Sequence, residues 1–157
     1  MNDELHRPQP TSAGSDHYRR LERMYLTAAT INDYFQPKIT IGDGTAVIRI
    51  EVDPKFFHAA GAVHGSVYFK AMDDAAFFAA NSVVEDVFVL TTSFNIHLLR
   101  PVTEGTLIAT GTLVSATKSL LIADAELKDD RDRLVGRGTG TFMKSTMLLA
   151  DVPGYAR

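Results

Sequence analysis

The chain has 157 residues, of which 45% are hydrophobic, 22% are charged and none is cysteine, and its formal net charge is −3. This length supports one packed domain and excludes two domains with substantial cores of their own. The absence of cysteine excludes disulfides, thiolate metal sites and a cysteine nucleophile, and the basic residues are scattered rather than gathered into the patch that nucleic-acid binding requires.

From the composition of the N-terminal residues we expect no secretory signal and a cytoplasmic protein. Asp3 and Glu4 lie where a secretory signal would be positive, and no run reaches the roughly 18–20 apolar residues of a membrane span. Residues 1–14 are polar and proline-containing without apolar periodicity, which predicts a disordered tail. Residues 147–157 are expected to form a C-terminal tail, which leaves a single domain at 15–146.

An amphipathic helix is predicted from Asp16 onward. Apolar side chains recur at intervals of three and four over residues 18–29, while arginines and a glutamate occupy the other face. Ser15 or Asp16 is the expected N-cap, and the helix is expected to end around residues 32–35, before Pro37.

Two strands, a buried helix and four more strands follow. A Gly-Asp-Gly turn joins residues 39–41 to the alternating segment 46–52, which predicts a hairpin with one buried face. Residues 64–82 are apolar on almost every side, as in a buried helix. The later strands are expected at residues 88–99, 106–115, 120–128 and 134–143. This order predicts an α+β fold in which an antiparallel sheet of about six strands wraps around a long central helix.

Two acidic residues in the buried helix need an explanation, because an ionised carboxylate in an apolar helix is costly unless it is paired. One interpretation is a solvated ion pair between Lys70 and Asp74, joined by Asp73. The other is a functional acid. Desolvation would raise the pKa of such an acid and nearby donors would lower it, and the sequence leaves that balance open.

His64-Gly65-Ser66 stands at the start of this helix. The free N–H groups and the positive dipole end of a helix N-terminus can stabilise an oxyanion, and a glycine there lets a ligand approach the backbone. The alternative for the histidine is a capping or core side chain satisfied by the backbone.

Taken with Asp73, this motif resembles that of the hotdog-fold thioesterases of the phenylacetate-pathway (PaaI-like) type. Members of that family read His-Gly-Gly at the start of the central helix, with a catalytic Asp nine residues after the His, and that spacing selects Asp73 over Asp74. Residues 91–102 resemble the third strand and its Arg-Pro turn, and residues 137–142 resemble the last strand. The resemblance covers roughly residues 39–144 and implies the hotdog fold.

The resemblance also implies catalytic roles. Asp73 would act as general base or nucleophile, and the Gly65 N–H, next to His64, would polarise the thioester carbonyl across a dimer interface. Thr91 would help to orient the attacking water. His58 stands where the family usually has Asn; an imidazole can also donate, but its charge varies near neutral pH, which implies a shifted pH optimum or another acyl substrate.

Substrate-binding roles are implied for Ser66 in the motif and for Lys118 and Ser119, which fall where family members commonly contact coenzyme A. For Lys118 an exposed turn lysine is the equally open alternative. Phe69, Phe77 and Phe78 suggest an aryl or medium-chain acyl pocket, although aromatic residues at this spacing are commonly core.

The sequence therefore leads to an acyl-CoA thioesterase that releases free acid and coenzyme A. No metal or cofactor is expected, apart from the coenzyme A of the substrate. An exposed sheet edge predicts a homodimer, and we expect a dimer of dimers, a homotetramer, although the sequence does not distinguish dimer from tetramer. The alternatives are a non-catalytic acyl-CoA binding protein and a hydratase or dehydratase on the same fold.

Overall fold

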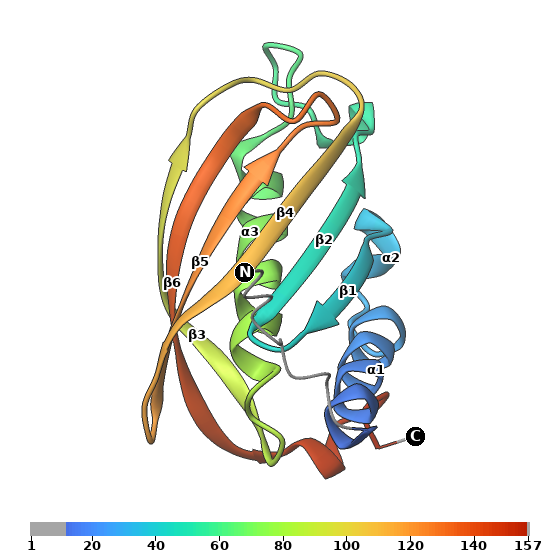
Figure 1. Ribbon diagram of the computed structural model, residues 1–157. Helices are drawn as coiled ribbons and strands as arrows, with labels where there is room; N and C mark the ends of the chain where they lie inside the picture. Colours follow the sequence, from blue (N-terminus) through green and yellow to red (C-terminus); the bar gives the residue numbers. More distant parts are fainter. Residues whose placement is uncertain (1–11, 157) are drawn as a thin grey trace, which may run out of the picture.

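The computed structural model describes residues 12–156 (Figure 1). The helical elements are α1 (Ser12–Thr27), α2 (Asn32–Phe35), η1 (Pro54–Phe56), α3 (Gly65–Asn81) and η2 (Leu149–Asp151). The strands are β1 (Lys38–Gly42), β2 (Thr45–Glu51), β3 (Val87–Leu98), β4 (Thr106–Ala116), β5 (Leu120–Lys128) and β6 (Leu134–Leu148).

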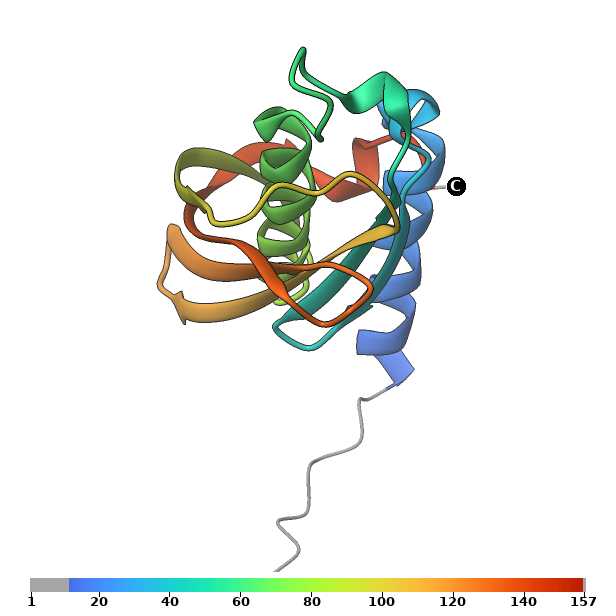
Figure 2. The same ribbon diagram turned by 90° about the horizontal axis from the view of Figure 1, so that it is seen from above.

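The six strands form one antiparallel sheet, in the order β1-β2-β4-β5-β6-β3. The sheet curves around α3, and α1 lies along its β1 edge (Figure 2). This arrangement is the predicted hotdog fold, with the predicted N-terminal helix.

Small residues let α3 lie close against the sheet. Ala71, Ala75 and Ala79 are fully buried. A Cβ atom at Gly111 of β4 would lie 2.1 Å from the Ala75 carbonyl oxygen, so that strand position requires glycine. The short side chains on both elements place the helix backbone directly on the sheet, and this fixes where its polar residues emerge.

The predicted boundaries of the N-terminal helix are wrong. It begins at Ser12, so residues 12–14 are helical, and Asp16 lies inside the helix, where it pairs with Arg20 at 3.4 Å instead of capping. It ends at Thr27 and a turn separates it from α2. Apolar periodicity detects only the turns that bury a face, which is why it missed the polar first turn. Residues 1–11 of the predicted tail lie outside the described residues.

The C-terminal segment is packed structure, which corrects the tail predicted for residues 147–157. Strand β6 continues to Leu148, and both Leu149 and Tyr155 are buried. The Tyr155 hydroxyl bonds to His17 Nδ1 of α1 at 2.8 Å, and Arg23 donates to the Tyr155 carbonyl at 2.9 Å. Because these partners are more than 130 residues away along the chain, no local pattern indicates them. In the part of the chain that the structure describes, no helix is long and apolar enough to cross a membrane.

Candidate active site

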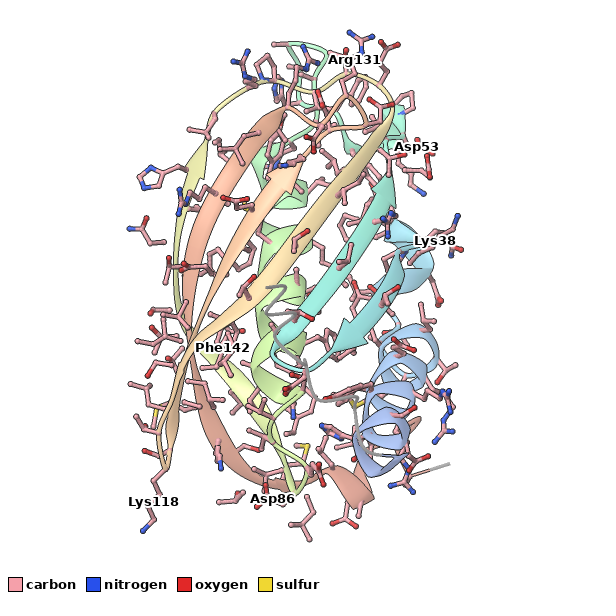
Figure 3. All side chains as sticks on the ribbon, in the orientation of Figure 1. Lys38, Asp53, Asp86, Lys118, Arg131 and Phe142 are labelled. Atoms are coloured by element: carbon pink, nitrogen blue, oxygen red, sulfur yellow. The ribbon has the colours of Figure 1, made fainter. Side chains whose placement is uncertain are left out.

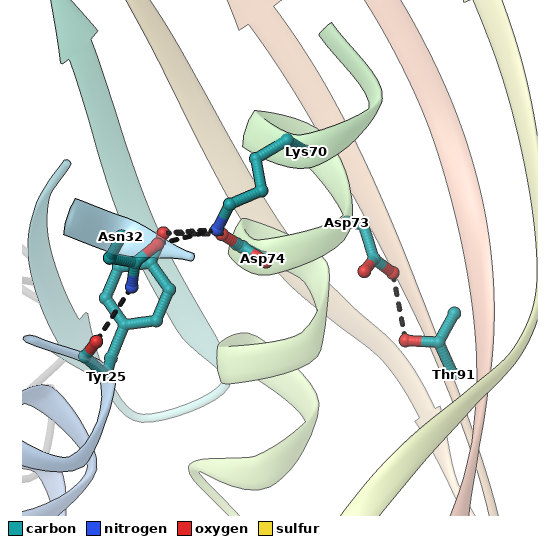
Figure 4. A network of polar contacts seen from close by, with 6 residues as sticks. All are labelled: Tyr25, Asn32, Lys70, Asp73, Asp74 and Thr91. Carbon is teal, nitrogen blue, oxygen red and sulfur yellow. Dashed lines mark hydrogen bonds and ion pairs between the residues drawn. The ribbon is translucent and has the colours of Figure 1, made fainter. Parts of the chain in front are cut away.

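Asp73 emerges from the middle of α3 toward β3 (Figure 4). Its Oδ1 accepts a hydrogen bond of 2.9 Å from the Thr91 hydroxyl. Both side chains are partly buried, and both line a cleft of about 410 Å³. The structure therefore places the Asp73 carboxylate, oriented by one hydroxyl, at the wall of a cavity.

Burial raises the pKa of Asp73 from its ordinary value of 3.8 to about 6. The hydrogen bond from Thr91 and the charge of Lys70 oppose this rise, and the neighbouring charge of Asp74 adds to it. Desolvation thus outweighs the nearby donors, a balance that the sequence left open. A carboxylate with a pKa near 6 is ionised at neutral pH and is a stronger base than an exposed aspartate.

Asp74, the next residue, belongs to a separate network (Figure 4). Its Oδ2 accepts from the Tyr25 hydroxyl at 2.5 Å and pairs with Lys70, whose Nζ also donates to Asn32 Oδ1 at 2.9 Å. The Lys70–Asp74 pair of the sequence interpretation is present. However, it is not solvated, because the side chains are only 12% and 16% exposed beneath α1 and α2, and Asp73 takes no part in its hydrogen bonds.

The cleft beside Asp73 is mainly apolar. Phe77 and Phe78 of α3 and Phe88 of β3 form one part of its lining. Ring centroids of Phe77 lie 4.9 Å from Phe78 and 5.2 Å from Phe88, so these residues serve the core and the cleft together. The remaining apolar lining comes from the end of α1, the turn after it, β3 and the C-terminal segment, namely Met24, Ala28, Ala29, Ile31, Leu90 and Val152.

A second cleft of about 270 Å³ lies at the N-terminus of α3, and His58 and Gly65 both line it. A Cβ atom at Gly65 would lie 2.8 Å from Leu98 Cδ1, so the end of the Leu98 side chain lies against the helix start. His64 is the N-cap, whose Nδ1 accepts from the Ser66 N–H at 3.1 Å. Within residues 12–156, no acceptor pairs with the Gly65 N–H. That amide is free to donate to a ligand.

His58 has one ring nitrogen engaged and one available. Its Nδ1 accepts from the Ala60 N–H at 3.1 Å, so the neutral ring carries its proton on Nε2. The side chain is exposed and lines the cleft at the helix start, which makes this Nε2–H a candidate donor beside the Gly65 N–H.

One protomer does not unite all the predicted site residues. Asp73 and Gly65 are eight residues apart on α3, about 12 Å along the axis, and line different clefts. The hydroxyl of Ser66 contacts His64 Nδ1 at 2.8 Å. Lys118 and Ser119 are exposed at the tip of the β4–β5 hairpin, outside the linings of both clefts (Figure 3).

Sequence reasoning missed the contribution of the N-terminal helix. The sequence pattern marks Tyr25 only as an apolar position of an amphipathic helix and Asn32 only as part of a helix end. In the structure both contact the Lys70–Asp74 pair. No sequence signal specifies this contact, because residues 38 or more positions apart form it.

The sequence matches a known family over its central part. Residues 60–136 match the family model of the thioesterase superfamily, and this span includes His64, Asp73 and Thr91. Over this span the chain is similar to the thioesterase superfamily, and its sheet and central helix have the hotdog arrangement. A protein of Saccharolobus solfataricus with a provisional esterase assignment is 23% identical over 81% of this chain and 91% of that protein.

Solved structures share the hotdog domain. The PaaI protein of the Escherichia coli phenylacetic acid degradation operon superposes with a TM-score of 0.79 at 21% identity, over 87% of this chain and 99% of that chain. A thioesterase of Haemophilus influenzae gives a TM-score of 0.69 at 17% identity, over 77% of this chain and 85% of that chain. These likenesses concern the fold, and residue roles depend on the site itself.

Proposed function

We propose that this hotdog domain hydrolyses acyl-CoA thioesters to a free acid and coenzyme A. The observation that carries the proposal is the Asp73 carboxylate, raised in pKa to about 6 and held by Thr91 at the wall of an apolar cleft. Thioester hydrolysis needs a base for water, donors for an oxyanion and space for an acyl group. The chain offers each of these.

In the proposed reaction Asp73 takes a proton from water as the water oxygen attacks the thioester carbonyl carbon. The Gly65 N–H and the His58 Nε2–H, in the cleft at the helix start, donate to the resulting oxyanion. Collapse of the tetrahedral intermediate breaks the C–S bond, and the proton held by Asp73 passes to the departing thiolate. In the alternative course Asp73 attacks the carbonyl itself, and water hydrolyses the anhydride that forms.

Two copies of the chain would complete this site. Strand β3 is at an edge of the sheet, and its Leu90 and Leu98 are 51% and 52% exposed. Antiparallel pairing of two β3 strands, centred between Phe94 and Asn95, places the Thr91 position of one strand opposite the Leu98 position of the other. Asp73 lies next to Thr91, and Gly65 lies next to Leu98. The pairing would therefore bring the base of one copy toward the oxyanion donors of the other.

Coenzyme A would extend from this shared site toward solvent. Lys118 and Ser119 are exposed and free to bind its phosphates from a neighbouring copy, which is the role that the family resemblance implies. We propose a homodimer as the active unit, assembled as a dimer of dimers and working on acyl-CoA in the cytoplasm.

The proposal is tested by thiol release from a panel of acyl-CoAs, measured with the wild-type protein and with Asp73→Asn. We expect turnover of at least one member by the wild type and at least a hundredfold loss in the variant. Binding of acyl-CoA without thiol release would instead favour a non-catalytic binding protein. Water addition to an enoyl-CoA without thiol release would favour a hydratase.

A further inference from the structure

We infer that the turn Ala28–Ile31, between α1 and α2, is the specificity-determining wall of the acyl pocket. In this inference the turn limits the substrate to a compact apolar acyl group, a chain of about six carbons or a single aromatic ring. The inference rests on the proposed thioesterase function and adds to it residues that lie outside the matched span 60–136.

The cleft runs along one stripe of α3. The residues that line it from this helix are Lys70, Asp73, Asp74, Phe77 and Phe78, at intervals of three and four that place them on one face. Beyond Asp74 the stripe becomes apolar, and Phe88 of β3 faces it from the other side. A thioester carbonyl at Asp73 would therefore direct its acyl chain toward the phenylalanines.

The opposite wall is the turn after α1. Ala28 and Ala29 are small and leave the cleft open, while Ile31 lines it with 55% of its surface exposed. An isoleucine exposed to this extent gains apolar contact when an acyl chain covers it. A larger side chain in place of either alanine would occupy the space that the chain needs.

Hydrogen bonds fix this wall relative to the catalytic helix. Tyr25, just before the turn, donates to Asp74, and Asn32, just after it, donates through Nδ2 to the Tyr25 carbonyl at 2.7 Å. Asn32 also accepts from Lys70 of α3. Both ends of the turn are therefore tied to α3 within one helical turn of Asp73, so the width of the cleft is set by the fold.

The length of the cleft gives the size of the acyl group. From Asp73 to Phe78 the helix advances about 7.5 Å. An extended chain advances about 1.2 Å per bond, so this distance accommodates about six bonds or one aromatic ring. An acyl group of twelve carbons would extend beyond the phenylalanines.

The test compares one narrowing variant, one widening variant and a matched control. Ala29→Phe fills the cleft, Ile31→Ala enlarges it, and Leu26→Phe adds a ring to an exposed position of α1 outside the cleft lining. The kcat/KM of each is measured with acetyl-, hexanoyl-, phenylacetyl- and dodecanoyl-CoA. Binding of a non-hydrolysable thioether analogue of hexanoyl-CoA and the mass in solution are measured alongside.

We expect Ala29→Phe to lower kcat/KM for hexanoyl- and phenylacetyl-CoA at least tenfold, with acetyl-CoA changed less than about twofold. Ile31→Ala should raise kcat/KM for dodecanoyl-CoA relative to kcat/KM for hexanoyl-CoA. Leu26→Phe should have the kcat/KM values of the wild type for all four substrates. Equal changes for all substrates, or none, would overturn the inference. A change in mass with unaltered selectivity would also overturn it, because the cleft would then be a contact between copies. If the wild type hydrolyses none of the four acyl-CoAs, the proposed function is refuted instead. In that case, weaker binding of the thioether analogue by Ala29→Phe than by the wild type would still support the turn Ala28–Ile31 as a wall of the acyl pocket.

Discussion

The neighbouring substitutions Asp73→Asn and Asp74→Asn should change stability in opposite directions. Asparagine resembles a protonated aspartate, and its carbonyl can still accept from Thr91. In the wild type, Asp73 has a pKa of about 6 in the folded state and an ordinary value of 3.8 in the unfolded chain. Folding therefore favours its protonated form, and the ionised form destabilises the fold.

These two pKa values determine how the stability of the protein changes with pH. Between about pH 4 and pH 6 the folded protein retains a proton that the unfolded chain has lost, so stability falls as the pH rises through this range. Above pH 6 the ionised Asp73 lowers the free energy of unfolding by about 3 kcal/mol, at 1.36 kcal/mol per pH unit. Asp73→Asn removes this destabilisation. It should be more stable than the wild type at pH 8, and the difference should vanish toward pH 4.

Asp74→Asn should behave differently, although burial also raises the pKa of Asp74 against the opposing effects of Lys70 and Tyr25. A neutral amide leaves the Lys70 ammonium without its carboxylate in a site where that side chain is 12% exposed. A buried charge without its counterion is costly, so we expect a loss of about 2 to 3 kcal/mol. Asp73 keeps its own hydroxyl partner in this variant, and activity should fall much less than in Asp73→Asn.

Thermal or urea unfolding between pH 4 and pH 8, combined with thioesterase assays, checks both variants at one protein concentration. For Asp73→Asn we expect a Tm at pH 8 raised by roughly 6 to 12 °C together with at least a hundredfold lower kcat. A lower stability of Asp73→Asn than of the wild type at pH 8 would contradict the destabilising role of the ionised Asp73, since the carboxylate would then stabilise the fold. The assignment of Asp73 as the catalytic acid is refuted if Asp74→Asn is the variant that abolishes activity.

Three further predictions follow from the same geometry. Thr91→Val removes the hydrogen bond that lowers the pKa of Asp73. The acid limb of the pH profile of kcat/KM, near pH 6 in the wild type, should therefore move to higher pH. Thr92→Val changes an exposed neighbour and is the control, which should leave the acid limb unchanged. His58→Ala should lower kcat/KM tenfold to a hundredfold, on the scale of one lost oxyanion donor, with the far-ultraviolet circular dichroism unchanged. An unchanged kcat/KM would remove His58 from the site. Light scattering at micromolar concentration should give at least a dimer, and a monomer with full activity would contradict a site shared between two copies.

Local sequence patterns predict much of the architecture. The alternating residues of β2 and the largely apolar α3 predict a sheet around a central helix, because the periodicity of apolar side chains is a local property of the chain. The His64-Gly65-Ser66 motif likewise predicts the helix start that the structure contains. The selection of Asp73 over Asp74 depends on the resemblance to the hotdog thioesterases, in which the catalytic Asp follows the His of the motif by nine residues.

Contacts between distant segments are what the tertiary structure alone decided. A solvated Lys70–Asp74 pair was one of the two interpretations that the sequence allowed, and the last eleven residues were predicted to be a tail. Burial of that pair depends on Tyr25 and Asn32, and the packing of Tyr155 depends on His17. The raised pKa of Asp73 has the same origin, because desolvation depends on every segment that surrounds the carboxylate and not on its neighbours along the chain.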